Sequence, residues 1–356
     1  EILRCLVGSE MCIRDRPRCD GLTTIWILKP SERTFTRLLR SRLGAYMLAG
    51  LSFLLIFAAS VLAKLPAVPT ARGLVTGMGA APHISGSASV GGALALIALI
   101  MTGMIILNKT FNFLRTSSML YIGVFGLMEA ASPIISTRLS SGMIVAIVML
   151  SALGLMYSIY QRPKECAKRI FLTFFLLSFG SMAQYAFIAY IPVFIAGCAQ
   201  MRCFSMKSLM AAGVGIAVPW WIMWGAGIIH WSDLVFPANL SIFSQLDLDD
   251  IAQLVAVIVV TVIAGFTLTL VNMVKIYSYN ARTRSFNGLL VTVTIATLLL
   301  AMVDFANVTA YLTLLNCCVA YQAALCFKIT AEKRGYLTVV ALLSIYFILF
   351  AWSIFI

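Results

Sequence analysis

The sequence predicts an all-α protein, a polytopic transmembrane helical bundle with about eleven membrane segments. Hydrophobic residues make up 61% of the chain and charged residues only 11%, whereas a soluble domain carries about 25% charged residues. The apolar runs are also continuous for about 20 residues, which is the length that a helix needs to cross a hydrocarbon core of about 30 Å. They lack the polar and apolar alternation of a membrane β-barrel. A chain of this composition requires a lipid bilayer as its solvent.

The first residues differ in composition from the apolar chain that follows. Cys5 to Asp15 reads "CLVGSEMCIRD", which resembles one translated frame of a sequencing-library adapter; the alternative is a genuine basic arm. We therefore expect residues 1–16 to be an adapter artefact, and we exclude them from fold reasoning as for any fusion scar. Residues 17–43 are expected to form a basic cytoplasmic segment, and 44–356 a single transmembrane helical domain.

Charged residues divide the remaining chain into ten apolar runs. These are 44–63, 88–107, 118–135, 140–160, 170–201, 208–231, 251–274, 286–304, 308–327 and 336–355. Nine are expected to be single spans. The run 170–201 is too long for one span, because a continuous helix of this length would extend about 48 Å. Its centre reads "FGSMAQ", where Gly180, Ser181 and Gln184 offer a break. We therefore expect two short helices of about 15 residues here, either as thin spans or as a re-entrant pair.

The lysines and arginines indicate how the chain is threaded. Beyond residue 16 they lie before the first span and in the even-numbered connections, and the odd-numbered connections carry only Lys64, Arg72 and Arg138. This asymmetry follows the positive-inside rule if 170–201 crosses twice or returns to its starting side. It predicts a bacterial inner-membrane protein with a cytoplasmic N-terminus and a periplasmic C-terminus. The net charge of +13 then reflects topology and attraction to anionic lipids, so the bilayer is the expected partner and nucleic acid is not.

The two long outer loops are expected at 64–87 and 232–250. "SIFSQL" in the second loop is a candidate interfacial helix. The acidic residues Asp247, Asp249 and Asp250 precede the next span, where they interact favourably with the helix dipole. No metal-ligand spacing, phosphate-binding loop or nucleophile motif is present in the sequence, so we expect no cofactor and no metal.

Glu129 is the candidate for intramembrane chemistry. It lies in "GVFGLMEAASP", within the third span, and an ionisable residue inside a membrane is costly enough to suggest function. The functional interpretation is a proton or cation site, or a carboxylate that faces a cavity from the outer side. The structural interpretation, which we favour, is a buried carboxyl bonded to a neighbouring helix or one at the mouth of a short span. Asp304 lies near the outer end of its span, and we expect it to occupy a tight helical hairpin and to cap the next helix. "PWWIMW" and His230 are typical of an interfacial aromatic belt.

Residues 105–235 also resemble known membrane proteins. The stretches "LNKTFNFLRTSSMLYIGVFGLMEAASPIIS" and "LMAAGVGIAVPWWIMW", with the intervening double helix, are similar to a family of uncharacterised multi-pass inner-membrane proteins of Bacteroidetes-type bacteria. That resemblance implies a location and no activity. The region is more loosely similar to multi-span polyprenyl-phosphate-sugar glycosyltransferases. Those enzymes place a catalytic acid in the first outer loop, where this chain has only Lys64, Arg72 and His83.

Three functions remain open on the sequence. The first is a non-catalytic protein accessory to envelope biogenesis, which we favour because the others lack signature residues. The second is an outer-face glycosyltransferase, polymerase or ligase that uses a polyprenyl-linked sugar. Its candidate residues are Arg72, His83, Arg138 and Asp233, and it requires an outer pocket that brings the arginines within about 10 Å of an acid. The third is a transporter coupled through Glu129, which requires Glu129 to face a water-filled path in the bundle; a lipid-facing or tightly packed Glu129 would count against it.

Overall fold

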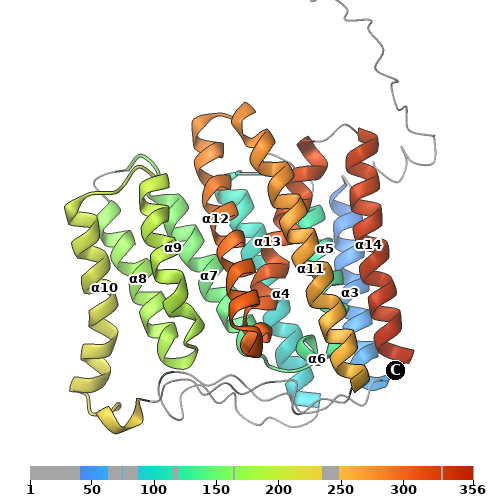
Figure 1. Cartoon of the computed structure of the whole chain (residues 1–356), viewed down its shortest axis with the longest axis horizontal. Coiled ribbons are helices and arrows are strands. Elements are labelled where there is room, and N and C mark those ends of the chain that lie inside the picture. Colours follow the sequence, from blue (N-terminus) through green and yellow to red (C-terminus); the bar gives the residue numbers. More distant parts are fainter. Residues whose placement is uncertain are drawn as a thin grey trace, which may run out of the picture.

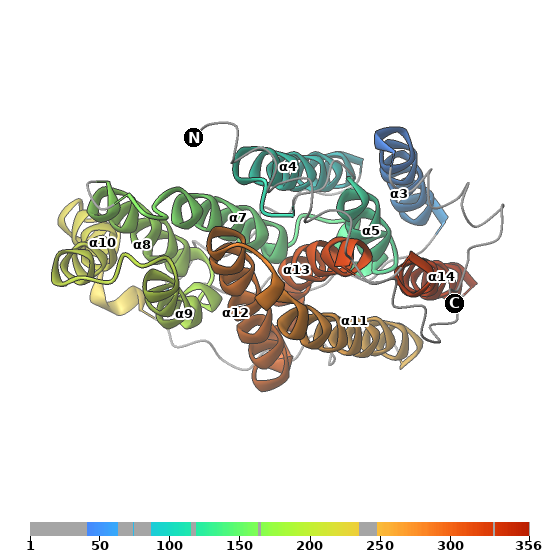
Figure 2. The same cartoon turned by 90° about the horizontal axis from the view of Figure 1, so that it is seen from above.

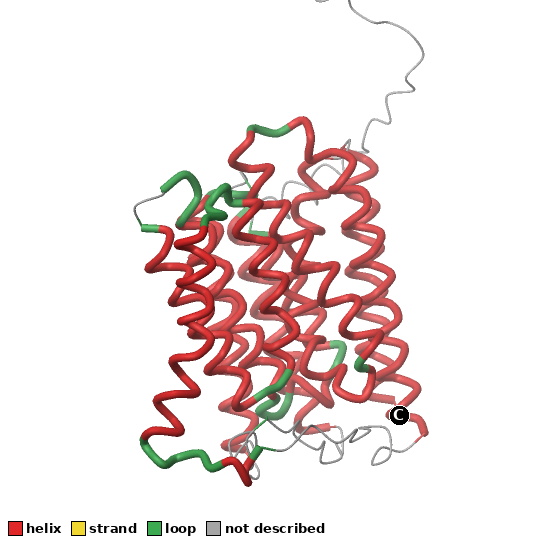
Figure 3. Tube along the Cα trace, turned by 60° about the vertical axis from the view of Figure 1, so that its left-hand side comes forward, coloured by secondary structure: helices red, strands yellow, loops and turns green. Residues whose placement is uncertain are grey.

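The computed structural model describes residues 41–62, 74, 87–114, 119–162, 165–234, 248–329 and 332–355. Within these ranges the chain forms helices and no β-strand, which confirms the all-α prediction. The helices stand side by side in one elongated bundle (Figure 1). Loops gather at its two ends (Figure 3), as expected of a chain whose helices cross the same apolar layer.

Nine helices in the described ranges are long and apolar enough to cross a membrane. They are α3 (Arg42–Leu62), α4 (Ser87–Phe111), α7 (Ser141–Ser158), α8 (Cys166–Ala183), α10 (Met206–Gly225), α11 (Leu248–Lys275), α12 (Ala281–Val303), α13 (Val308–Ile329) and α14 (Glu332–Phe355). Two shorter apolar helices complete the set, α5 (Leu120–Ala130) and α9 (Ala186–Gln200). Together they correspond to the eleven predicted membrane segments, and the chain is an integral membrane protein by this criterion.

The long run 170–201 forms two helices, as expected. The chain passes along α8, turns, and returns along α9 (Figure 1). The break lies at Gln184, whose backbone is extended with φ −147° and ψ 113°. Gln184 is one of the three residues expected to offer the break, and the other two, Gly180 and Ser181, remain helical. Gly180 has a different role. A Cβ at this position would lie 2.8 Å from the Phe187 ring, so the lack of a side chain lets α8 and α9 meet closely at the turn.

The expectation of a single helix over 118–135 is wrong. Helix α5 ends at Ala130, residues 131–132 leave the helical path, and a one-turn helix α6 (Pro133–Ser136) follows. Pro133 causes the break because proline has no N–H to continue the α5 ladder, while its fixed φ suits the first position of a new helix. The 11 residues of α5 extend about 16 Å, roughly half of a hydrocarbon core. Irregular backbone at this depth must be covered by protein, and residues 119–137 are all buried.

Helix α13 is the centre of the bundle. It packs against α5, α7, α11, α12 and α14 (Figure 2), and its whole apolar window is buried. By contrast α10 lies at one edge, where it packs mainly on α8. The central position explains why α13 can carry Thr313, Asn316 and Gln322 on an otherwise apolar surface, since none of them faces lipid.

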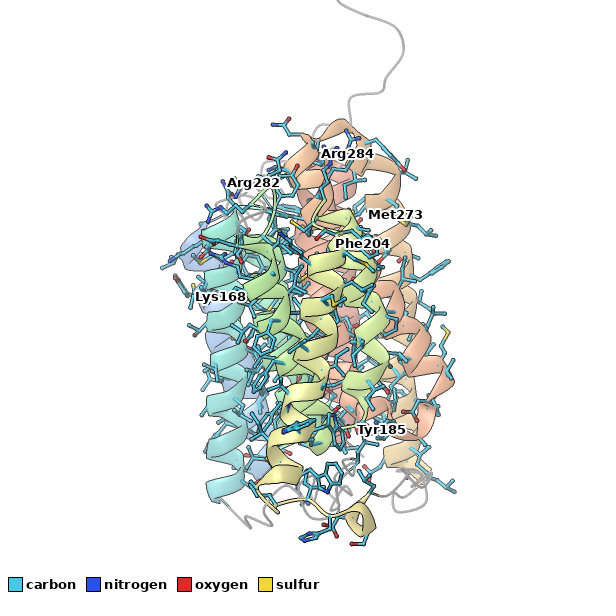
Figure 4. The ribbon with its side chains drawn as sticks, turned by 90° about the vertical axis from the view of Figure 1, so that its left-hand side faces the viewer. Lys168, Tyr185, Phe204, Met273, Arg282 and Arg284 are labelled. Atoms are coloured by element: carbon cyan, nitrogen blue, oxygen red, sulfur yellow. The ribbon has the colours of Figure 1, made fainter. Side chains whose placement is uncertain are left out.

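The helix directions place all but one of the described lysine and arginine side chains at one end of the bundle, here called the basic end. Lys168 on α8 and Arg282 and Arg284 on α12 lie toward this end, and Tyr185 lies toward the other (Figure 4). Among the lysine and arginine side chains that the structure describes, Arg138 alone belongs to the opposite end, where α6 leads into α7. The predicted segregation of cations therefore holds for the described residues, while the side of the membrane that each end faces stays a prediction.

Asp249 and Asp250 lie in the first turn of α11, as the dipole argument predicts. Asp247, the candidate interfacial helix and most of the first long loop lie outside the described residues.

Candidate functional site

Glu129 is a fully buried carboxyl near the middle of the bundle. It is the penultimate residue of α5, and its side chain is 0% exposed. The Nδ2 atom of Asn316 on α13 donates a hydrogen bond of 2.9 Å to Glu129 Oε1. The second oxygen, Oε2, has no hydrogen-bond partner among the described residues, and no described basic residue pairs with this carboxyl. Burying a carboxyl with half of its bonding capacity unused is costly.

The helix break beside Glu129 is held by neighbouring side chains. Ser132 donates to the Glu129 carbonyl through its backbone N–H at 3.1 Å and through its hydroxyl at 3.2 Å. Gln253 of α11 donates its Nε2 to the Ala131 carbonyl at 2.8 Å. Carbonyls left free at a helix end must find donors when they are buried, and here α11 supplies one of them. The broken helix is therefore a stable part of the fold.

The polar face of α13 adds further buried atoms to this site. Thr313 Oγ1 and Asn316 Oδ1 are buried and have no partner among the described residues. The two residues are three positions apart, so they lie on the same face of α13. We call the Glu129 carboxyl, together with the Asn316 side chain that bonds to it, the Glu129 site; Thr313 lies beside Gly142 of α7. A carboxylate oxygen can take up a proton, and carboxylate and amide oxygens can coordinate a hard cation.

A second polar cluster lies toward the end opposite the basic end. Asp304 occupies the tight hairpin between α12 and α13, as expected, but its side chain does not cap α13; that part of the prediction is wrong. Its Oδ2 instead accepts hydrogen bonds from the hydroxyls of Tyr185 and Tyr311, the latter at 3.0 Å. Nearby, Gln184 Nε2 donates to Asn307 Oδ1 at 3.4 Å. These contacts join the α8–α9 hairpin to the α12–α13 hairpin.

The sequence contained a signal for this cluster that we did not use. Tyr185 and Gln184 are adjacent polar side chains at the interruption of an apolar run. Polar groups at such a break need partners from another helix. Asp304 and Asn307 lie between two apolar runs, at the same end of the bundle as Gln184 and Tyr185. This shared position could have suggested that the two pairs meet.

The structure describes two of the four residues expected for an outer-face enzyme, Arg138 and Asp233. Arg72 and His83 lie outside the described residues. Arg138 follows α6, which packs among α3, α4 and α5, whereas Asp233 closes the short 3-10 helix η1 (Trp231–Asp233) beyond the edge helix α10. In Figure 1 these elements lie in different parts of the bundle. Neither of the two cavities that border described residues, one beside α10 and one at the basic end, is lined by Arg138.

Asp233 is engaged in its own turn. The backbone N–H of His230 donates to Asp233 Oδ2 at 2.9 Å, and the imidazole Nδ1 is 3.6 Å from the same oxygen. The backbone hydrogen bond from His230 is the main reason why the pKa of Asp233 is held below its ordinary value. These contacts are those of an acid that caps its own turn.

The aromatic side chains near His230 line an apolar hollow. Trp220, Trp221 and Trp224 of α10 border a cavity of about 350 Å³ together with His230. The Trp221 side chain is 78% exposed. Large exposed aromatic groups at the end of an edge helix are consistent with the predicted aromatic belt.

Comparison of the chain with protein-family models, with curated proteins and with solved structures finds no match. The two resemblances drawn from the sequence therefore remain expectations. Function has to be argued from the geometry of the Glu129 site itself.

Proposed function

We propose that this chain is a membrane transporter whose coupling site is the Glu129 site, with a proton as the coupling ion. The observation that carries the proposal is the Glu129 carboxyl, which is 0% exposed, bonded through one oxygen to Asn316 and unpartnered at the other. An intramembrane carboxyl without a cationic partner is a functional-site hypothesis by default.

The position of Glu129 on a broken helix supports the same proposal. Transporters place their ion sites near the middle of the membrane, at discontinuous helices whose free carbonyl ends face the cation. Glu129 stands at the carbonyl end of α5, directly before the break. A proton suits this site because protonation removes the charge from a medium of low dielectric constant. The unpartnered Oε2 is an atom on which the proton can reside.

In this structure Glu129 is packed and faces no described cavity, and this packing taken alone argues against transport. Glu129 lines neither the cavity beside α10 nor the cavity at the basic end. Its side chain is buried where α5 packs on α13. The proposal therefore includes a second conformation in which α5 and α13 separate and admit water. Alternating access of this kind is the general mode of secondary transport.

The proposed location is a bacterial inner membrane with the basic end in the cytoplasm, which the positive-inside rule supports. The resemblance of residues 105–235 to multi-pass inner-membrane proteins agrees with it. No contact among the described residues favours the lipid-linked-sugar enzyme or an accessory role over transport.

The proposal can be tested without knowing the transported solute. The full chain is reconstituted into liposomes on a solid-supported membrane, and the charge displacement after a rapid pH jump is recorded. We expect a transient current in the wild type, because protons reach Glu129 from one side. Glu129→Gln keeps the size and the hydrogen bonding of the side chain and removes the titration, so the transient should disappear.

Glu165→Gln is the matched control. Glu165 is an exposed acid before α8 that pairs with Arg169 at the basic end, so its replacement should leave the transient unchanged. Equal transients in the wild type and in Glu129→Gln would contradict the proposal, and so would a wild type with no transient.

A further inference from the structure

A cavity of about 320 Å³ opens at the basic end, well separated along the helices from the Glu129 site. Its volume lies at the lower limit for small-molecule sites. Three arginines from different places in the sequence border it: Arg162 follows α7, Arg169 lies in the first turns of α8, and Arg282 begins α12. Three guanidinium groups around one hollow repel one another in the absence of an anion.

Two of these arginines are held in place by the protein. Arg169 donates to the Ser158 carbonyl at 3.2 Å and pairs with Glu165. The guanidinium carbon of Arg282 lies 5.3 Å from the centre of the Phe286 ring, which is cation–π geometry. Arg162 is exposed, and its side chain has no partner among the described residues. A site with oriented donors loses less entropy when it binds a ligand.

The wall of the cavity is a packed aromatic cluster. The Tyr157 and Phe286 rings are stacked with centroids 4.7 Å apart, and Phe111 meets Tyr157 edge-on at 5.5 Å. The Tyr157 hydroxyl donates to the Phe286 carbonyl at 3.0 Å. This cluster joins α4, α7 and α12 and keeps the cavity from collapsing, since aromatic rings in contact have few alternative packings.

The positive charge and the hydrogen-bond donors of the lining favour a phosphate group as the ligand. The described residues that line the cavity include no acid, and Glu165, which pairs with Arg169, offsets one of the three positive charges. Guanidinium groups bind phosphate through paired N–H donors, and the hydroxyl of Thr110 in the lining can add a further hydrogen bond. A carboxylate ligand would use fewer of these donors than a phosphate group, which has three acceptor oxygens.

We propose that this cavity binds a phosphate group, carried either by an anionic lipid headgroup at the membrane surface or by a soluble phosphate compound. The arginine cavity bordered by Arg162, Arg169 and Arg282 provides the donors, and the aromatic cluster fixes their spacing. The proposal is independent of transport through Glu129, because no residue is shared between the two sites.

The test uses the full chain, delipidated in neutral detergent. One arm titrates inorganic phosphate and pyrophosphate by isothermal calorimetry. The other arm measures retention of phosphatidylglycerol against phosphatidylcholine by native mass spectrometry. We expect saturable binding in at least one arm. The double variant Arg162→Gln/Arg282→Gln should bind at least about tenfold more weakly, because it loses two charge-assisted contacts.

Arg284→Gln is the matched control, since Arg284 lies on the same helix but bonds to the carbonyls of Tyr277 and Tyr279, outside the cavity. It should bind as the wild type does. Binding of phosphatidylglycerol alone would identify a lipid headgroup, and binding of phosphate or pyrophosphate a soluble ligand. If the double variant does not fold, Arg162→Gln alone replaces it, because this side chain is exposed. Absence of binding in both arms, or equal binding by the cavity variant and Arg284→Gln, would overturn the proposal.

Discussion

Replacement of Gly142 by any larger residue should lower the stability of the contact between α7 and α13. A Cβ at this position would lie 2.4 Å from the Thr309 carbonyl oxygen, whereas ordinary contact begins at 3.4 Å. The blocking atom belongs to the backbone, so no change of rotamer can relieve the clash, and the two helices must separate by about 1 Å. A gap of this size forfeits a quarter to a half of the dispersion energy of each affected contact. We therefore expect Gly142→Ala to destabilise the protein by about 2 kcal/mol, within the usual range for overpacking.

Gly213 provides the matched control for this prediction. It lies in α10, and a Cβ there would meet no atom within 4 Å, so Gly213→Ala should stabilise the helix by up to about 1 kcal/mol through the lower entropy cost of alanine. Both variants are unfolded in mixed micelles with increasing sodium dodecyl sulfate, and helicity is followed by circular dichroism. Equal stability of the two variants would refute the claim that α7 and α13 are in backbone contact.

Three further predictions concern threading, the second polar cluster and pH. In sealed vesicles, single cysteines introduced as Lys207→Cys and Ser232→Cys should react with an impermeant maleimide from opposite sides, because α10 separates them; reaction of both from one side would contradict the threading. Asp304→Ala leaves two tyrosine hydroxyls without their acceptor, so it should lower the free energy of unfolding by about 2 kcal/mol. The control Asp249→Ala changes an exposed residue and should alter the free energy of unfolding by less than about 0.5 kcal/mol. Because the pKa of Asp233 is lowered in the folded protein, its carboxylate stabilises the η1 turn at pH values above the ordinary pKa of 3.8, and this contribution is lost as the pH falls through the lowered pKa. Carbon NMR of labelled aspartate should give a titration midpoint for Asp233 below 3.8. A titration midpoint at or above that value would disprove the cap.

Local properties of the chain were sufficient for the class and the number of membrane segments. An apolar run must cross the bilayer because its transfer from water is favourable, and the thickness of the hydrocarbon core limits each crossing. That limit alone required 170–201 to turn back, and the structure has this turn at Gln184. The break of α5 was missed although Pro133 signals it, because the summed hydropathy of 118–135 does not distinguish a straight helix from a broken one.

Tertiary structure alone decided which helix is central and which polar residues meet. Most spans here are apolar on all sides, and lipid is as apolar as a neighbouring helix, so hydropathy does not show which face is buried in protein. Glu129 meets Asn316, and Tyr185 meets Asp304, across more than a hundred residues of sequence. Such contacts depend on how the helices are arranged around α13. The sequence determined that these polar groups are costly in a membrane, and the packing of the bundle decided how each of them is satisfied.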